Sequence, residues 1–408
     1  MNIEIITIGD ELLIGQVIDT NSAWMSKELS EAGFDVIYIT SIKDEYKAIF
    51  SAIEDGFKRA DVLLLTGGNG PTKDDITKNT LCDYFEDELT LNQEVIDNIK
   101  TLFKQRNIEI NELTHNQALV PKKSKIIQNR VGTAPILWFE KNRKTLVSMP
   151  GVPFEMRYAM QEEIIPRLTA QYEAKAFIKH VIYTHGVSES ALAMLLNNFE
   201  EQLPSGFALA YLPGGGVIRL RLSIKGEEYL PEMDKQVEKL KNIIGNYLLI
   251  ESEDSLEQVL GTILKNKGFS ISLAESCSGG YLSYLFTSMP GASSYFKGGV
   301  VSYANSAKMN ILNVSQSSID KYGAVSKQVV EEMAKGAIGA FETDCAIAIS
   351  GIAGPDGGTA EKPVGTVWIC TICNDIIVSK QYMFGKSREN NISRSATMAV
   401  VQMLKLIG

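Results

Sequence analysis

The chain has 408 residues, 45% of them hydrophobic and 22% charged, with a formal net charge of -9. These values are ordinary for a globular protein of two or three domains, and the acidic balance argues against general nucleic-acid binding, which needs a basic surface. Five scattered cysteines exclude a disulfide-stapled scaffold, and neither a membrane-spanning apolar run nor a signal-peptide pattern at residues 1–9 is present, so we expect a cytoplasmic protein.

The first third of the chain predicts strands that alternate with helices. Residues 2–8 form an apolar, β-branched run, residues 22–32 are helix-like, and a second strand-like run follows at 36–39. Apolar residues at helical spacing over 46–57 precede a continuous apolar strand at 62–65. The alternation predicts a mostly parallel sheet, with ligands bound at the carboxyl ends of the strands.

Three polar segments would face that end of the sheet. They are Asp10, the loop at 66–75, and Pro150-Gly151, which follows a strand at 145–149 and precedes a helix at 154–165. The loop reads TGGNGPTKDD and matches neither G-x-x-x-x-G-K-[ST] nor G-x-G-x-x-G. Its glycines let backbone N–H groups approach an anion, and its two aspartates could bind a hard divalent cation. An ordinary loop with an acidic helix start is an equally good interpretation.

The middle of the chain predicts a β-α-β-α unit of about domain size. Strands at 176–185 and 217–224 each lead into a helix, at 188–199 and 231–244, and residues 213–216 form a turn. No catalytic set is visible in this part, so we interpret it as a small spacer or dimerisation module.

The last third begins at a helix capped by Ser255 with Gln258 three residues on. A strand at 269–273, a turn of small residues at 274–280 and a helix at 281–286 follow, and this arrangement predicts Ser276 as a nucleophile beside the free N–H groups of a helix start. Close packing alone would also select small residues at such a turn.

Histidine is informative by its absence from this region. The three histidines are His115, His180 and His185, so a Ser-His-Asp triad confined to the last third is excluded. The base of Ser276 must be Lys, Tyr or a carboxylate, unless a histidine comes from another domain. On spacing alone, Lys308 is typical of a helix-surface lysine.

A second glycine-dense loop spans residues 350–365 between two strong strands, and loops of this length in compact domains tend to be functional. Arg388 and Arg394 flank the start of the final helix and could share a phosphate, although two surface arginines would look the same. We interpret Cys370 and Cys373 as buried strand residues rather than a metal or redox pair.

Together these segments resemble the competence/damage-inducible protein CinA family in its full-length form, over essentially the whole chain. In the first domain the resemblance is carried by GDELLIGQVIDTNSAWMSKELSEAGF, TGGNGPTKDD and PGVPFEM. In the last domain it is carried by AESCSGG, residues 303–308, SGIAGPDGG and EKPVGTVW.

The resemblance implies an α/β protein of three domains. Residues 1–165 would form a mostly parallel, three-layer molybdopterin-binding-like domain with metal-dependent ADP-ribose pyrophosphatase activity. Residues 166–250 would form a small α+β, KH-like domain. Residues 251–408 would form an α/β nicotinamide mononucleotide amidohydrolase domain that needs no cofactor. The implied partners are these small nucleotides. A homodimer is expected only as the commonest state of soluble oligomers, and composition argues against membrane or direct nucleic-acid contact.

Carried over residue by residue, the catalytic set is Ser276, Lys308 and Tyr303. The implied metal ligands at the N-terminal site are Asp10, Asp74 and Asp75. The implied substrate-binding residues are Gly67, Gly68, Asn69, Gly70, Thr72, Pro150 and Gly151 in the first domain, and Glu275, Cys277, Ser278, Gly279, Gly280, Asn305, Gly351, Gly354, Asp356, Gly357, Gly358, Lys362, Arg388 and Arg394 in the last. Ser278 stands where the family usually has threonine, and Asn69 where it more often has leucine.

The expected mechanism is attack of Ser276 on the carboxamide carbon. Lys308, neutral because it is buried, would take the proton directly or through Tyr303. Backbone N–H groups of residues 277–280 would hold the oxyanion, and the loop at 351–358 with Arg388 or Lys362 would hold the phosphate. Two other classes stay open, a nucleotide- or molybdopterin-binding protein without turnover and a partner in DNA uptake or repair.

Overall fold

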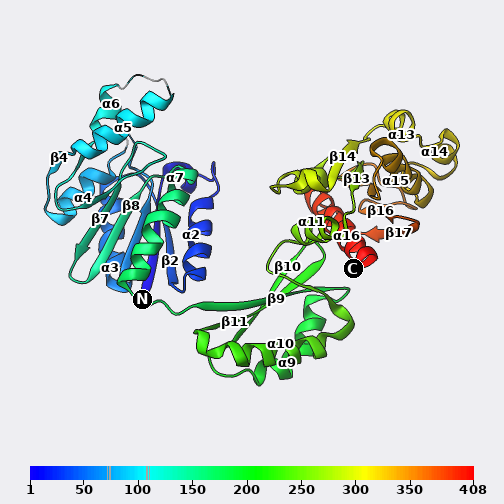
Figure 1. Cartoon of the computed structure of the whole chain (residues 1–408), viewed down its shortest axis with the longest axis horizontal. Coiled ribbons are helices and arrows are strands. Elements are labelled where there is room, and N and C mark those ends of the chain that lie inside the picture. The colour runs from blue at the N-terminus through cyan, green and yellow to red at the C-terminus, as the bar shows by residue number, and fades with distance from the viewer. Residues whose placement is uncertain (71, 73–74, 107–108, 110) are drawn as a thin grey trace. The chain divides into compact units, whose positions relative to one another are not determined.

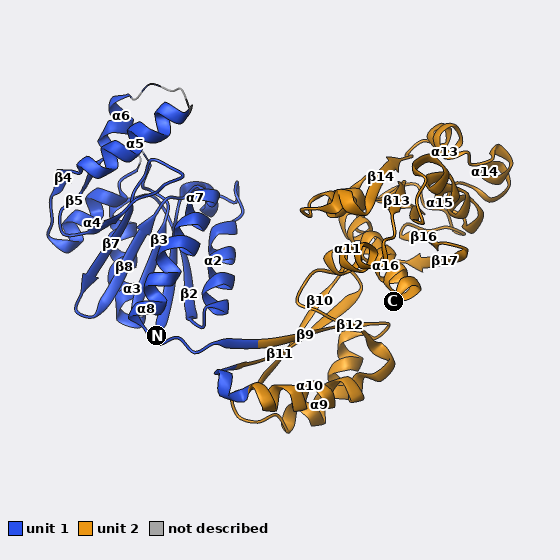
Figure 2. Cartoon of the chain, viewed as in Figure 1, with its two compact units in different colours: residues 1–178, 225–229 blue, residues 179–224, 230–408 orange. Residues whose placement is uncertain are grey.

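The computed structural model describes residues 1–70, 72, 75–106, 109 and 111–408. The chain divides into two compact units, residues 1–178 with 225–229 and residues 179–224 with 230–408 (Figure 2). The predicted division into three domains stays a prediction. Within the described residues, no helix is long and apolar enough to span a membrane.

Unit 1 is built on a six-stranded sheet in the order β2-β1-β3-β8-β7-β6 (Figure 1). The first four strands run parallel, and β7 and β6 continue the sheet antiparallel. All five side chains of the central strand β3 are buried, as its continuous apolar sequence predicts. The strands are β1 (Asn2–Ile8), β2 (Asp35–Ile42), β3 (Val62–Thr66), β6 (Lys125–Ile127), β7 (Ile136–Lys141) and β8 (Lys144–Met149).

Helices cover both faces of this sheet, because alternate strand residues point to opposite sides. On one face Val62 and Leu64 pack with Met25 of α2 and Met156 of α7, and on the other Leu63 packs with the helices α3 and α4. The helices are α1 (Asp10–Leu13), α2 (Thr20–Glu31), α3 (Tyr46–Arg59), α4 (Thr77–Phe85), α5 (Gln93–Arg106), α6 (Glu112–Asn116), α7 (Pro153–Tyr158), the π-helical η1 (Ala159–Ile164) and α8 (Ile165–Gln171). A short pair of strands, β4 (Leu89–Leu91) and β5 (Leu119–Pro121), completes the unit.

Unit 2 begins with a four-stranded sheet in the order β10-β11-β9-β12. Two of its strands, β10 and β12, were not predicted, and β10 pairs antiparallel with β11 around a turn in which Gly215 and Gly216 adopt positive φ. The elements are β9 (Phe177–His185), α9 (Glu189–Glu201), β10 (Ala208–Gly214), β11 (Val217–Lys225), α10 (Leu230–Ile244), η3 (Gly245–Tyr247) and β12 (Leu248–Glu251). The short helix η2 (Glu227–Tyr229) lies in the segment 225–229, which belongs to unit 1.

A five-stranded sheet in the order β14-β13-β15-β16-β17 forms the rest of unit 2. The three strands β14, β13 and β15 run parallel, and β16 and β17 are antiparallel. Its first helix carries the capping box that Ser255 and Gln258 predict. The elements are α11 (Leu256–Lys267), β13 (Ile271–Glu275), α12 (Tyr281–Thr287), η4 (Ala292–Ser294), β14 (Phe296–Val301), α13 (Asn305–Leu312), α14 (Gln316–Tyr322), α15 (Lys327–Phe341), β15 (Cys345–Gly351), β16 (Thr366–Cys373), β17 (Ile376–Met383) and α16 (Arg388–Ile407).

The two sheets of unit 2 share one hydrophobic core. Tyr183 of β9 and Val217 of β11 are buried in the same cluster as side chains of α11, α12 and α16. The turn at Gly215 lies directly on α16, since a Cβ atom added there would be 2.4 Å from Thr397 Oγ1. The opposite face of the five-stranded sheet has its own core with α13, α14 and α15.

Candidate functional site

Ser276 lies at the carboxyl end of β13, on the turn that the sequence predicts. The strand ends at Glu275, residues 277–280 form the turn, and α12 begins at Tyr281. The turn closes because Gly279 and Gly280 both adopt left-handed φ values, of 64° and 95°. The Ser276 N–H donates to the Ile349 carbonyl at 3.0 Å, which fixes the nucleophile against the neighbouring strand β15.

Lys308 reaches Ser276 from the first turns of α13. Its Nζ lies 2.9 Å from Ser276 Oγ, and the residue is only 1% exposed. The same Nζ contacts the carbonyl oxygens of Ser302 at 2.6 Å and Tyr303 at 3.3 Å. Burial lowers the pKa of the Lys308 amine, because desolvation disfavours the charged form.

A neutral amine would suit these three contacts. It has two N–H bonds and one lone pair, so the carbonyls of Ser302 and Tyr303 can accept the N–H bonds while the lone pair faces the Ser276 hydroxyl. The arrangement is that of a serine nucleophile with a lysine general base. Lys308 is thus a buried partner of Ser276 and not the surface lysine that spacing alone suggests.

Tyr303 takes a different place from the predicted proton relay. Its side chain is 61% exposed, and its hydroxyl accepts a hydrogen bond from Arg388 Nη2 at 3.0 Å. Among the described residues, the phenol makes no hydrogen bond to Ser276 or Lys308. The predicted relay is therefore absent from this structure, and the direct route from Ser276 to Lys308 is present.

Glu275, predicted to bind substrate, is wholly buried behind the turn. Its carboxylate accepts hydrogen bonds from the N–H groups of Gly280 and Leu282, both at 3.1 Å, and from the N–H and hydroxyl of Ser283 at 2.7 and 2.6 Å. These contacts also take the Gly280 N–H out of the predicted oxyanion site. The N–H groups of Cys277 and Ser278 make no hydrogen bond to another described residue and remain as candidate donors.

A cavity of about 270 Å³ opens beside the dyad. It brings together ten of the residues predicted for this site with five that were not named as site residues, namely Ala324, Val325, Ser350, Ile352 and Ala353. The predicted residues that line it are Ser276, Cys277, Tyr303, Asn305, Lys308, Gly351, Gly354, Asp356 and Gly357, together with Arg388 from α16. Six of the lining residues come from the 351–357 loop, and small apolar residues such as Ala353 give little signal of a binding site by residue type alone.

The cavity loop is held by two polar side chains of α16. Arg388 donates from Nη1 to the Gly354 carbonyl at 2.8 Å. Asn391, which the sequence analysis missed, is buried and donates from Nδ2 to the carbonyls of Ala353 and Gly385, both at 2.9 Å. The first turn of α16 therefore sets the position of the loop that faces Ser276.

Besides Glu275, six predicted substrate-binding residues of this domain do not line the cavity. Lys362 is turned away, because its ammonium donates to the Tyr322 carbonyl at 2.7 Å, and Arg394 lies over the Phe384 ring at 5.3 Å from the centroid. The six are Ser278, Gly279, Gly280, Gly358, Lys362 and Arg394.

The cysteines do not compete with the serine. Burial raises the pKa of the Cys277 thiol to about 12, so this neighbour of Ser276 stays protonated at neutral pH. Cys370 and Cys373 are buried on β16, as predicted. Among the residues that the structure describes, no three His, Cys, Asp or Glu side chains are grouped to hold a metal ion.

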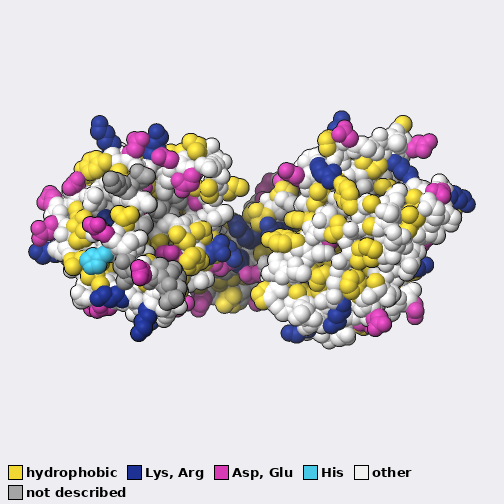
Figure 3. All heavy atoms as spheres, turned by 90° about the horizontal axis from the view of Figure 1, so that it is seen from above, with side chains coloured by type: hydrophobic (Ala, Val, Ile, Leu, Met, Phe, Trp, Pro, Cys, Tyr) yellow, Lys and Arg dark blue, Asp and Glu magenta, His cyan; other side chains and the backbone are white. Residues whose placement is uncertain are grey.

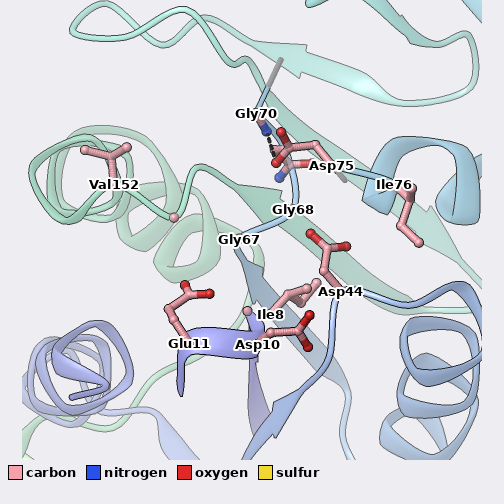
Figure 4. Close-up of a pocket in the computed structure, with 13 residues that line it drawn as sticks. Ile8, Asp10, Glu11, Asp44, Gly67, Gly68, Gly70, Asp75, Ile76 and Val152 are labelled. Atoms are coloured by element: carbon pink, nitrogen blue, oxygen red, sulfur yellow. Dashed lines mark hydrogen bonds between the residues drawn. The ribbon is translucent and has the colours of Figure 1, made fainter. Parts of the chain in front are cut away.

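A second cavity, of about 670 Å³, lies at the carboxyl ends of β1 and β3 in unit 1. The predicted residues Asp10, Gly67, Gly68, Asn69, Gly70, Asp75 and Gly151 line it, together with Glu11 and Asp44, which the sequence analysis missed. Figure 4 shows the carboxylates of Glu11, Asp10 and Asp44 around the glycine loop. The described lining residues thus offer four carboxylates and no lysine, arginine or histidine.

Several predicted residues of this loop make internal contacts. Asp75 accepts hydrogen bonds from the N–H groups of Gly70 and Thr72, at 2.7 and 2.8 Å, and from the Thr72 hydroxyl. Asn69 is buried and donates to Ser148 Oγ and the Met149 carbonyl. Thr72 and Pro150 do not line the large cavity, and the Pro150 carbonyl accepts from Thr66.

The predicted metal set is only partly within the described residues, because Lys73 and Asp74 lie outside them. Asp10 and Asp75 line the same cavity, and their oxygen atoms are donors that suit a hard divalent cation. The charge of the cavity also fits such a cation. The metal and its ligands stay a prediction.

Comparison with known proteins identifies both ends of the chain. Residues 253–407 match the family described as CinA C-terminal domain, and residues 4–170 match the family described as Probable molybdopterin binding domain. A CinA-like protein of Flavobacterium psychrophilum is 43% identical over 415 residues, covering 100% of this chain and 99% of that protein. A CinA-like protein of Cytophaga hutchinsonii is 41% identical over 405 residues, covering 98% of this chain and 97% of that protein.

Among solved structures, a competence-damaged protein (CinA) superfamily protein of Escherichia coli is 34% identical, with a TM-score of 0.36, and covers 37% of this chain and 88% of that chain. The molybdopterin biosynthesis enzyme MoaB of Thermus thermophilus is 17% identical, with a TM-score of 0.28, and the match covers 41% of this chain and 90% of that chain. The family matches, taken with the sheets described above, confirm the predicted α/β fold class with a molybdopterin-binding-like N-terminal part.

Proposed function

This chain belongs to the CinA family, and from that membership and the buried contact between Ser276 and Lys308 we propose that its C-terminal part deamidates nicotinamide mononucleotide. The products are nicotinate mononucleotide and ammonia. The 2.9 Å contact is the observation that carries the proposal, because it places a serine hydroxyl beside a buried amine whose pKa is lowered by burial, which favours the proton-accepting form.

In the first step Ser276 Oγ attacks the carboxamide carbon, and its proton passes to Lys308 Nζ. The carbonyl oxygen becomes an oxyanion, which the N–H groups of Cys277 and Ser278 would hold. When the tetrahedral intermediate collapses, the C–N bond breaks, Lys308 returns the proton to the leaving nitrogen, and ammonia departs. The nicotinoyl group is left as an ester on Ser276.

In the second step water replaces Ser276 on the acyl carbon. Lys308, now neutral again, takes a proton from the attacking water and returns it to Ser276 Oγ as the ester bond breaks. The products are the nicotinate carboxylate, with one released proton, and the regenerated serine. One base therefore serves both half-reactions.

Arg388 is the proposed partner of the 5′-phosphate. It is the only arginine or lysine besides Lys308 that lines this cavity in the described part of the chain, and its contacts to the Gly354 carbonyl and the Tyr303 hydroxyl already fix its direction. A guanidinium held in place binds phosphate with little loss of side-chain entropy. Lys362 and Arg394, which were predicted as phosphate partners, do not line the cavity.

The test is ammonia release from nicotinamide mononucleotide by the purified protein, measured beside Ser276→Ala and Lys308→Met. Release by the wild type and its loss in both variants would support the proposal. Equal release by the wild type and Ser276→Ala would refute it, because the scheme has no other nucleophile.

A second activity is proposed for the N-terminal part, hydrolysis of ADP-ribose to AMP and ribose 5-phosphate. The supporting observation is the 670 Å³ cavity at the carboxyl ends of parallel strands, where α/β proteins bind ligands, with a glycine loop along its edge. Gly67 and Gly68 have left-handed φ values of 111° and 64°, which leaves their backbone close to the cavity without side chains.

Asp10 and Asp75 are the described residues proposed to hold a divalent cation here. When bound, such a cation would neutralise the pyrophosphate and polarise its P–O bonds. The N–H groups of the loop would orient the phosphates. The carboxylates would repel a phosphate that arrives without a cation. The competing proposal is a binding domain without turnover, and recovery of unchanged ADP-ribose after long incubation with metal would favour it.

A direct role with DNA has less support. On the face in Figure 3, lysine and arginine side chains are interspersed with aspartate and glutamate. A DNA affinity that falls steeply with salt concentration would revive that alternative.

A further inference from the structure

The carboxylate of Glu275 is a fully buried acidic group beside the dyad, and the proposed chemistry does not use it. It is 0% exposed and directly precedes the nucleophile in the chain. A carboxylate is costly to bury unless its oxygens are hydrogen-bonded, and here they accept four hydrogen bonds. A group retained at that cost needs an explanation.

All four donors belong to the far side of the nucleophile turn. They are the N–H groups of Gly280, Leu282 and Ser283 and the Ser283 hydroxyl. The residue before α12 is Gly280, which has no side chain to cap the helix, so the cap comes from Glu275, five residues earlier. The side chain thereby closes residues 276–280 into a ring with Ser276 on its rim.

The backbone of the same residue holds the base. The Glu275 carbonyl accepts the Ser302 N–H at 2.8 Å, and the Ser302 carbonyl accepts Lys308 Nζ at 2.6 Å. Glu275 is thus connected to the nucleophile turn through its side chain and to Lys308 through one intervening residue. A shift at this position would change the geometry of both members of the dyad.

We infer that Glu275 is a positioning residue that holds Ser276 in its reactive geometry against Lys308. It touches neither the cavity nor the substrate, and it acts through the turn. The inference rests on the proposed serine chemistry but not on the identity of the substrate. It replaces the substrate-binding role that the sequence predicts for this residue.

Glu275→Gln is the informative variant, because the amide keeps the size of the side chain but turns an N–H₂ group toward backbone N–H donors. We expect kcat for ammonia release to fall on the order of 10²-fold with KM unchanged, since a small misplacement of a reacting group costs about that much. The rate at which a fluorophosphonate probe labels Ser276 should fall by a similar factor. That rate reports the serine alone and does not require nicotinamide mononucleotide to be the substrate.

Asp344→Asn is the matched control. Asp344 accepts hydrogen bonds from the N–H and the hydroxyl of Ser270, both at 2.7 Å, which is the same pairing that Glu275 makes with Ser283. Ser270 and Asp344, however, precede β13 and β15, at the end of the sheet away from Ser276. The control should leave the probe rate and kcat unchanged.

Ser283→Ala removes one of the four hydrogen bonds and serves if Glu275→Gln does not fold. It should give a smaller fall in kcat and in labelling rate, again without a change in KM. Wild-type labelling rates in a folded Glu275→Gln protein, or in Ser283→Ala, would overturn the inference. Labelling of Ser276 that depends on Glu275, without any ammonia release, would uphold the inference and reject the proposed substrate.

Discussion

The two cavities of this chain obtain their reactivity from different sources. At the C-terminal cavity the protein itself would supply the proposed nucleophile, the proposed base and the hydrogen bonds that hold them, and Lys308 is 1% exposed. At the N-terminal cavity the described walls supply four carboxylates and loop backbone, and an anionic ligand there needs positive charge from elsewhere. The reactive groups of the C-terminal site would come from the chain itself, whereas the N-terminal site would depend on a bound cation.

The largest expected effect tests the C-terminal site. Ser276→Ala should reduce ammonia release on the order of 10³-fold or more, because the covalent route is lost. Hydrolysis of ADP-ribose by the same preparation should be unchanged and provides the control. A parallel loss of both activities would show that the two sites are not independent.

Chelation tests the other side of the comparison. Removal of divalent ions should lower ADP-ribose hydrolysis on the order of 10²-fold or more and should leave ammonia release unaffected. Activity should return when a divalent ion is added back. If ammonia release falls as well, the C-terminal site also needs a divalent ion.

The pH dependence should also separate the two sites. Burial lowers the pKa of Lys308 from the ordinary lysine value of 10.5, and only the neutral amine accepts the serine proton. The kcat/KM for ammonia release should therefore rise about tenfold per pH unit below that lowered pKa and level off above it. A rate that falls as the pH rises over this range would show that the protonated lysine is the active form.

Asn391→Asp should damage binding rather than chemistry. The new carboxylate would face the carbonyls of Ala353 and Gly385 in place of the amide donor, so the cavity loop should shift. We expect KM for nicotinamide mononucleotide to rise about tenfold, equivalent to roughly 1.4 kcal/mol of binding. The labelling rate of Ser276 should stay near that of the wild type, and a fall in this rate would place Asn391 with the dyad instead.

The smallest effect is expected from Tyr303→Phe. The phenol contacts Arg388 and not the dyad, so its loss should raise KM a few-fold through a less well fixed guanidinium, worth about 1 kcal/mol. Steady-state kinetics would measure this directly. A fall in kcat comparable to that of Ser276→Ala would restore the proton relay through Tyr303.

The sequence predicted the parts of this protein whose chemistry is local. Strands such as Val62–Thr66 follow from continuous apolar runs, and the turn at Ser276 follows from its small residues and two glycines. The pairing of Ser276 with Lys308 came from the family resemblance, since spacing alone placed Lys308 on a surface. Lys308 and Ser276 are 32 residues apart in the chain, so their contact depends on the tertiary fold.

The missed features depend on long-range contacts. A glutamate beside a nucleophile looks the same in sequence whether it faces a ligand or, as Glu275 does, the far side of its own turn. The basic residues Lys362 and Arg394 suggested a phosphate site, but tertiary contacts occupy both. The strand at Ala208–Gly214 was missed because the turn predicted at 213–216 starts two residues too early: Gly215 and Gly216 form the turn, whereas Pro213 and Gly214 pair with β11.

The shared core of unit 2 has a consequence for dividing this protein into pieces. Tyr183 and Val217 come from the four-stranded sheet, yet they are buried among side chains of α11, α12 and α16. A fragment cut at residue 253, where the family match begins, would carry the dyad but uncover the apolar surface that those two residues protect. An excised C-terminal fragment of this chain would therefore need surface substitutions on α16 to remain dispersed in solution, whereas a cut near residue 178 leaves that core intact.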